Sequence, residues 1–70
     1  MEAAIVANFG TISQSGTWNL ELNLVQWPKS KFPKYDIRSW SPDHNACSKG
    51  ITMSKDELIK LRDLLNTLDI

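Results

Sequence analysis

The chain has 70 residues, eight basic and eight acidic side chains, one histidine and one cysteine, and a formal net charge of zero at pH 7. This length allows one domain, residues 1–70, and the single cysteine excludes an internal disulfide. Chains this short usually need disulfides, a metal or oligomerisation for stability. Metal-ligand residues are scarce, so we expect an oligomer without a metal or other cofactor.

The sequence also bears on location. Its start, Met1-Glu2-Ala3-Ala4-Ile5-Val6-Ala7, has no basic leader and no apolar run long enough for a secretory signal. No stretch approaches the ~20 apolar residues of a membrane span. The lone thiol fits a reducing compartment. We therefore expect a cytoplasmic protein, free or associated with the nucleoid, that does not bind membranes.

The charges are unevenly distributed along the chain. Between residues 29 and 50, five basic side chains stand against two acidic ones, a local charge of +3, and the remainder carries −3. A basic segment between acidic flanks can form a positive patch on a neutral protein. Ordinary variation of surface charge is the alternative interpretation.

The first half of the chain predicts two strands. Residues 3–12 are largely apolar and β-branched, which predicts a strand with Ile5, Ala7 and Phe9 on one face. Residues 17–27 alternate with a period of two. The alternation predicts a core face and an outer face. The core face carries Trp18, Leu20, Leu22 and Leu24, and the outer face carries Asn19, Glu21, Asn23, Val25 and Trp27.

A proline-rich loop and a third strand follow. Pro28 and Pro33 predict a loop over residues 28–33, because proline ends both helices and sheet pairing. Residues 34–41 alternate again, and if Ile37 faces the core then Arg38 and Trp40 share the open face. A tryptophan there must pack on a partner subunit or stack on a ligand.

The last part predicts a turn over residues 42–48, a short strand over 49–53 and a helix. Ser54 and Glu57 form the pattern of a capping box. The helix carries an apolar stripe at helical spacing. The stripe is wide enough to cover the sheet and meet a second copy, and a dimer with two-fold symmetry is the simplest closed arrangement. Its members are Leu58, Ile59, Leu61, Leu64, Leu65 and Leu68.

Catalytic and metal chemistry have little support. Asp43, His44 and Cys47 share one loop, but a structural zinc site needs four ligands and the chain has no other histidine or cysteine. Nucleophilic catalysis would require the thiol to be held against a base and an oxyanion hole. A polar turn is the simpler interpretation, and we expect no catalytic residue and no enzymatic activity.

Aromatic and cationic side chains alternate through the middle of the chain. Proteins that bind single strands combine a positive groove with aromatic side chains on which bases stack. We take as candidate nucleic-acid-binding residues Trp27, Lys29, Lys31, Lys34, Arg38, Trp40 and Lys49. From these residues alone, a protein-interaction module with the tryptophans buried at interfaces is an equal alternative.

The same region resembles a known family. Residues 33–44 (PKYDIRSWSPDH) and 49–54 (KGITMS) are similar to the YdbC-like bacterial branch of the positive cofactor four family, whose eukaryotic members are transcriptional coactivators. The resemblance implies a curved four-stranded antiparallel sheet followed by one C-terminal helix (ββββα), an α+β fold, as a homodimer that binds single-stranded DNA. It also implies stacking by Trp27 and Trp40, phosphate contacts from Arg38 and Lys49, and orientation of Arg38 by Asp36.

The sequence thus predicts a sequence-tolerant single-stranded DNA-binding homodimer that acts in transcription or DNA maintenance, with RNA as the other candidate ligand. A dimeric protein-interaction module is the alternative function. Residues 18–24 contain no cation, whereas family members often have basic residues in the second strand. We therefore expect weaker binding and a shallower salt dependence than in a more basic relative.

Overall fold

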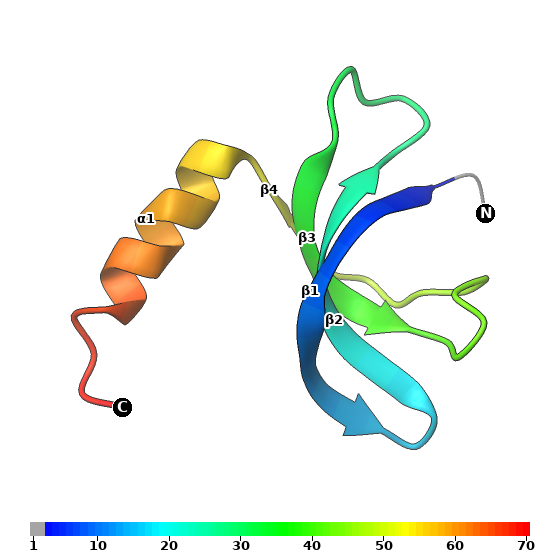
Figure 1. Cartoon of the computed structure of the whole chain (residues 1–70), viewed down its shortest axis with the longest axis horizontal. Coiled ribbons are helices and arrows are strands. Elements are labelled where there is room, and N and C mark those ends of the chain that lie inside the picture. Colours follow the sequence, from blue (N-terminus) through cyan, green and yellow to red (C-terminus); the bar gives the residue numbers. More distant parts are fainter. Residues whose placement is uncertain (1–2) are drawn as a thin grey trace.

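The structure is a computed structural model and describes residues 3–70. Its elements are β1 (Ala4–Ser15), β2 (Trp18–Gln26), β3 (Lys34–Trp40), β4 (Ile51–Met53) and α1 (Lys55–Leu65). The strands pair antiparallel in the order β1-β2-β3-β4 (Figure 1). The predicted α+β fold, a four-stranded antiparallel sheet followed by one C-terminal helix, is confirmed. No helix in the described part of the chain is long and apolar enough to cross a membrane.

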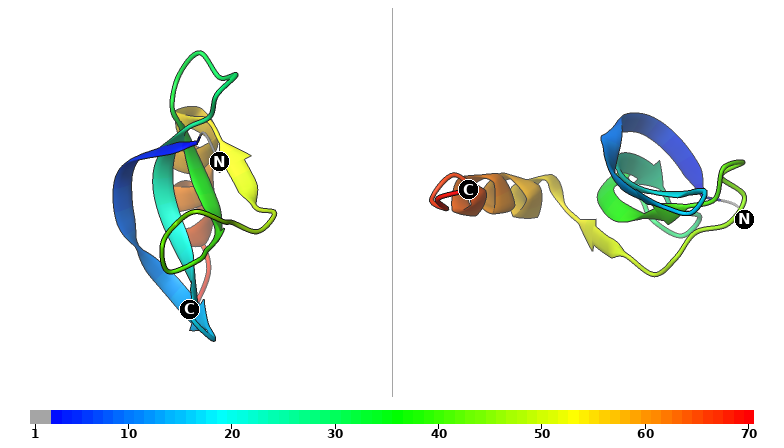
Figure 2. Two further views of the ribbon diagram at one scale, coloured as in Figure 1. Left: turned by 90° about the vertical axis from the view of Figure 1, so that its right-hand side faces the viewer. Right: turned by 90° about the horizontal axis from the view of Figure 1, so that it is seen from below.

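β1 departs from simple alternation. Its pairing with β2 shifts register three times, between Ile5 and Ala7, Asn8 and Gly10, and Thr11 and Ser13. Each such bulge adds a residue and bends the strand, and Figure 2 shows β1 curving over its neighbours. The predicted shared face for Ile5 and Phe9 is wrong. Ile5 lines a cavity with Glu21, whereas Phe9 stacks on Tyr35 on the opposite face.

The curled sheet encloses its concave face. We use this term for the face of β2 and β3 that carries the buried side chains Glu21, Asn23, Val25, Asp36 and Trp40. The prediction that the leucine-bearing face of β2 is the core and the other face is exposed is therefore wrong for this chain. A period of two separates the faces correctly, but curvature decides which of them is enclosed.

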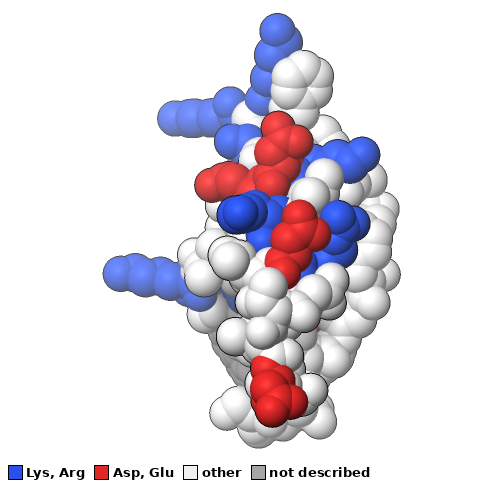
Figure 3. Space-filling view, turned by 90° about the vertical axis from the view of Figure 1, so that its left-hand side faces the viewer, with Lys and Arg blue, Asp and Glu red and all other residues white. Residues whose placement is uncertain are grey.

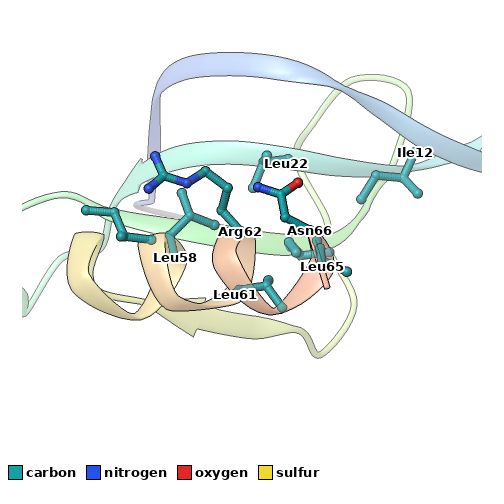
Figure 4. A pocket seen from close by; sticks show the side chains of 9 residues that line it. Ile12, Leu22, Leu58, Leu61, Arg62, Leu65 and Asn66 are labelled. Atoms are coloured by element: carbon teal, nitrogen blue, oxygen red, sulfur yellow. The ribbon is translucent and has the colours of Figure 1, made fainter. Parts of the chain in front are cut away.

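The opposite face, which we call the leucine face, is only half-buried at Leu20, Leu22 and Leu24. Helix α1 lies to one side of the sheet, connected through β4 (Figures 1 and 2), and none of its residues is fully buried. An apolar groove of about 500 Å³ separates the two. Figure 4 shows side chains of the sheet and the helix lining it, among them Ile12, Leu22, Leu58, Leu61 and Leu65.

Helix α1 begins at the predicted cap. The Glu57 amide donates to Ser54 Oγ at 3.2 Å, and the Ser54 amide donates to Glu57 Oε1 at 2.9 Å. The two bonds satisfy amides that have no partner within the helix. Hydrogen bonds with the backbone amide and the side chain of Ser54 lower the pKa of the Glu57 carboxyl below its ordinary value. The capping box is confirmed, and it sets the start of the helix directly after β4.

We expect Ser54→Ala to lower the free energy of unfolding by about 1 kcal/mol, the usual cost of losing an N-cap oxygen. Urea denaturation followed by far-UV circular dichroism measures this, with Ser54→Asp as a control that retains a capping oxygen. Identical urea midpoints for Ser54→Ala and the wild type would contradict the proposed stabilisation of α1 by the Ser54 cap.

The capping box also predicts a pH dependence. Because the pKa of Glu57 is lower in the folded chain, its contribution to stability is present above the ordinary pKa of 4.5 and is lost as the pH falls through the folded pKa. The stability difference between wild type and Glu57→Gln should therefore shrink on acidification below pH 4.5. A difference that stays constant over this range would contradict the linkage.

Candidate nucleic-acid interface

Arg38 is held on the concave face by a two-point ion pair. Its Nε lies 2.6 Å from Asp36 Oδ1 and its Nη2 lies 2.7 Å from Asp36 Oδ2. Strand alternation places both side chains on the same face of β3. Thr52 of β4 completes the group, since its hydroxyl donates to Asp36 Oδ2 at 2.9 Å and accepts from Arg38 Nη2 at 3.2 Å. The expectation that Asp36 orients Arg38 is confirmed.

The environment of Arg38 keeps it charged. Burial alone would lower the pKa of the guanidinium, but hydrogen bonds and charge interaction with Asp36, together with interactions with Cys47, raise the pKa above its ordinary value. The positive charge is permanent. It is also largely compensated by Asp36, whose side chain is 0 % exposed. Arg38 can therefore contribute donors to a phosphate, but little net charge.

Trp27 lies just beyond the end of β2 and packs against Arg38. The guanidinium carbon is 4.4 Å from the centroid of the indole ring, within the range of a cation–π interaction. Its indole nitrogen is buried and has no hydrogen-bond partner within residues 3–70. The half-buried ring thus has one face covered by Arg38, and any base must stack on what remains exposed.

Trp40 does not occupy an open surface. Its side chain is 1 % exposed, and its ring lies 5.8 Å from that of His44. The loop after β3 folds back over it through the bridge between Trp40 and Cys47 and the bond from the Ser41 amide to the Ala46 carbonyl. The expectation that Trp40 is available to stack bases is wrong, because this loop and the curl of the sheet enclose the ring.

The loop between β2 and β3 exposes the aromatic side chain that sequence reasoning missed. Phe32 is 65 % exposed, and Lys31 Nζ lies 5.7 Å from its ring centroid. The sequence does contain an indication that Phe32 is exposed. It stands between a lysine and a proline, in a loop that cannot pair as a strand. Phe32, the exposed lysines Lys29 and Lys31, and the exposed Lys34 at the start of β3 form what we call the basic loop.

The base of this loop has a defined conformation. Gln26 Nε2 donates to the carbonyls of Trp27, at 3.0 Å, and Ser30, at 2.7 Å. The Ser30 amide donates to the Trp27 carbonyl at 3.1 Å. These bonds close a turn beside Trp27. The basic loop and the Trp27–Arg38 pair are therefore neighbours. All of these residues except Phe32 are among the candidate binding residues named from the sequence.

Lys49 is exposed and precedes β4, which begins at Ile51 rather than at the predicted residue 49. Lys49 therefore lies outside the strand, and the alternation of side chains along β4 does not determine the face on which it lies. Gly50 follows at a close approach of two chain segments, because a Cβ there would overlap the Ile37 carbonyl oxygen and the Arg38 Cβ. The glycine lets the chain pass directly over Arg38, and Lys49 stands at the edge of the same face.

The Asp43–His44–Cys47 segment does not converge on one point. Asp43 accepts hydrogen bonds from Asn45 and Ser41, which lower the pKa of its carboxyl. His44, at a φ of 59°, turns instead to the sheet, where its Nε2 lies 2.9 Å from Glu21 Oε2. Residues 3–70 contain no group of three or more His, Cys, Asp or Glu side chains arranged to hold a metal ion.

The Glu21 carboxylate was also missed by sequence reasoning, which placed it on an exposed face. It is 3 % exposed and, besides His44, accepts hydrogen bonds from Asn23 Nδ2 at 3.0 Å and Asn8 Nδ2 at 3.3 Å. The sequence around Glu21 does not indicate that its side chain is buried, because its histidine partner is 23 residues away in the chain.

The basic side chains are less paired than the acidic ones. Within residues 3–70, salt bridges join only Arg38 to Asp36, His44 to Glu21 and Arg62 to Asp63. The lysines of the basic loop and Lys49 are in none of them. Figure 3, seen from the helix side, shows basic side chains projecting from the upper end and one edge of the molecule, with acidic side chains between.

Comparison with known proteins gives one informative result. No family model matches the chain. An uncharacterized protein of Treponema pallidum (strain Nichols) is 45 % identical over 67 residues, which cover 94 % of this chain and 78 % of the relative. The similarity spans all the elements described above.

The close approach at Gly50 is testable. We expect Gly50→Ala to lower the free energy of unfolding by about 1–3 kcal/mol, because the added methyl group forces the chain away from Arg38 and β3. Lys49→Ala is the matched control, and as a change at an exposed neighbour it should stay within about 0.5 kcal/mol of wild type. Equal urea midpoints for the two variants would contradict the close packing.

Proposed function

We propose that this chain, which belongs to the same family as the uncharacterized Treponema pallidum protein, binds single-stranded DNA as a YdbC-like member of the positive cofactor four group. The observation that carries the proposal is the basic loop, an exposed aromatic ring among three lysines that form no salt bridge with any residue from 3 to 70. Such a loop offers what an unpaired strand presents, since bases stack on the ring and phosphates pair with the cations.

The neighbouring surface extends this site. Trp27 and Arg38 lie at the base of the loop, and Lys49 lies at the other edge of Arg38. In the proposed mechanism the lysines attract the strand, Phe32 and the exposed part of Trp27 stack on its bases, and Arg38 adds directed hydrogen bonds. The proposed activity is binding without catalysis, in transcription or in DNA maintenance.

The acidic side chains of the concave face do not oppose this use of the surface. Asp36 is compensated by Arg38, and Glu21 is buried beneath His44. Asp43 is hydrogen-bonded within its own loop. Glu57 is hydrogen-bonded within its helix cap and also interacts electrostatically with Lys34. A chain with zero net charge therefore presents exposed lysines together at the basic loop, where they can act on an anion within about 10 Å at moderate salt.

The binding test uses fluorescence anisotropy of a labelled thymidine oligonucleotide, titrated with the protein at low and moderate salt. We expect Phe32→Ala to weaken binding roughly 5- to 150-fold, the equivalent of about 1–3 kcal/mol for a lost stacking platform. Lys31→Ala should reduce the slope of log affinity against log salt by about 0.7.

Two control variants accompany this test. Phe32→Leu keeps apolar bulk without a π face, so it should weaken binding as Phe32→Ala does if stacking is the interaction. Lys60→Ala removes an exposed cation of α1 and should leave affinity unchanged. Absence of oligonucleotide binding by the wild type at low salt would favour the dimeric protein-interaction module instead. Wild-type affinity in Phe32→Ala would remove the basic loop from the site.

We also propose that two copies associate through the leucine face and α1. The supporting observation is the apolar groove between them, together with leucines of the helix end that are half exposed, Leu64, Leu65 and Leu68. A single chain leaves this apolar surface in water, at a cost of about 25 cal/mol per Å². A symmetric pair would place the helix of each chain against the other and cover both surfaces.

Size-exclusion chromatography with light scattering tests the association. We expect a dimer for the wild type and a monomer for Leu65→Glu, because a carboxylate in the groove lining would lie unpaired in an apolar interface. Lys60→Glu, on an exposed position of the same helix, is the matched control and should remain dimeric. A monomeric wild type at micromolar concentration would contradict the proposal.

A further inference from the structure

The concave face contains a second cavity, of about 330 Å³, lined by Ile5, Asn8, Thr11, Glu21 and His44. We call it the Asn8–His44 pocket. Its walls come from the bulged strand β1, from β2 and from the loop after β3. Its volume falls at the lower end of the range of small-molecule pockets, about 300–1,000 Å³. None of its residues belongs to the site derived above.

The hydrogen bonds around Glu21 determine which groups of this pocket donate and which accept hydrogen bonds. An ionised carboxylate only accepts, so the groups that face it must present N–H. Asn8 Nδ2 donates to Glu21 Oε1 at 3.3 Å and to Asn23 Oδ1 at 2.7 Å, which uses both of its amide hydrogens. Asn8 Oδ1 therefore points away from the carboxylate. No hydrogen bond joins this oxygen to any other residue within 3–70.

His44 forms a flat wall of the pocket. One side of the ring lies against Trp40, at 5.8 Å between centroids and 30° between planes, and Nε2 is held by Glu21. The side chain nevertheless remains 40 % exposed. Trp40 thus supports an imidazole whose outer side can stack on another aromatic ring.

The pocket lies next to the proposed DNA-binding surface. Glu21 stands directly opposite Arg38 in the pairing of β2 with β3, and both side chains lie on the concave face. Trp27 packs against Arg38, and Glu21, the strand neighbour of Arg38, lines the pocket. A strand bound at Trp27 and Arg38 would therefore present its next bases to His44 and Asn8.

We propose that the Asn8–His44 pocket receives one unpaired base, stacked on His44, whose exocyclic amino group donates a hydrogen bond to Asn8 Oδ1. This rests on the proposed single-stranded DNA binding and adds a base preference to it. Cytosine and adenine carry such an amino group, whereas thymine has the acceptor O4 at the corresponding position. Thymine would bring an acceptor toward Asn8 Oδ1 and the carboxylate behind it, so the pocket disfavours it.

The decisive experiment changes the ligand and leaves the protein intact. Anisotropy titrations compare an all-thymidine oligonucleotide with the same oligonucleotide carrying one central cytidine, or one central N4,N4-dimethylcytidine that cannot donate. We expect the cytidine oligonucleotide to bind about fivefold tighter, the effect of one additional neutral hydrogen bond. The dimethylated one should bind no tighter than the thymidine oligonucleotide.

The outcomes separate the two proposals. Equal affinity for the cytidine and thymidine oligonucleotides overturns the base-selective pocket and leaves single-strand binding standing. No binding of any oligonucleotide overturns the proposed function itself. Tight binding of the dimethylated base also overturns the pocket, because the preference would then not depend on the donated hydrogen.

A substitution of Asn8 tests whether the preference for cytidine arises in this pocket. Asn8→Ala should bind the cytidine and thymidine oligonucleotides with equal affinity, because both the acceptor for the amino group and the repulsion of thymine O4 are lost. Gln14→Ala removes an amide from the exposed end of β1 and should keep the preference. Retention of the preference in a folded Asn8→Ala protein would place base selection elsewhere. If Asn8→Ala does not fold, the dimethylcytidine comparison decides in its place.

Discussion

The ion pair of Asp36 with Arg38 is the interaction on which the rest of the structure depends. Asp36 has no exposure to solvent, and a buried carboxylate without a partner would cost several kcal/mol. Arg38 meets both of its oxygens and Thr52 adds a third contact. β4 must then pass close over the guanidinium, which Gly50 permits. Thr52 of β4, Gly50 and Trp27 all lie against this ion pair.

The two faces of the sheet have unusual roles for a chain of this size. The concave face buries charged and amide groups, each of them hydrogen-bonded, while the leucine face remains half open. Buried polar groups of this kind stabilise little beyond what their desolvation costs. A monomer would thus rely on a small apolar core, Val25 and Trp40. Covering the leucine face with a second chain would supply the apolar burial that a single chain lacks.

Local patterns were sufficient to predict the elements. Alternation gave β2 and β3 nearly to the residue, and the capping box gave the first residue of the helix. The Asp36–Arg38 pair was predicted through the resemblance, and alternation agrees because it places residues two apart on one face. Each of these rests on residues that are close in sequence, where geometry is set by the backbone alone.

What could not be predicted depends on curvature and on contacts distant in sequence. Three bulges in β1 curl the sheet, and that curl encloses Trp40 and Glu21, which alternation alone assigned to an open face. The pairing of Glu21 with His44 joins two strands and a loop. No pattern within ten residues of either side chain specifies it. Phe32 was overlooked because a single aromatic residue in a loop has no periodicity to mark it.

The same curvature explains how a protein without net charge can present a cationic surface. Folding places the acidic side chains of the sheet inside, against Arg38 and His44, and leaves the lysines of the basic loop outside. Charge counted along the sequence treats these groups alike, but solvent and ligand meet only those at the surface. The charge that a ligand meets at the edge of the concave face therefore depends on which carboxylates the curled sheet encloses. Glu21 and Asp36 are both enclosed. Loss of the curl would expose both carboxylates beside the lysines and weaken the field that an anionic strand would meet.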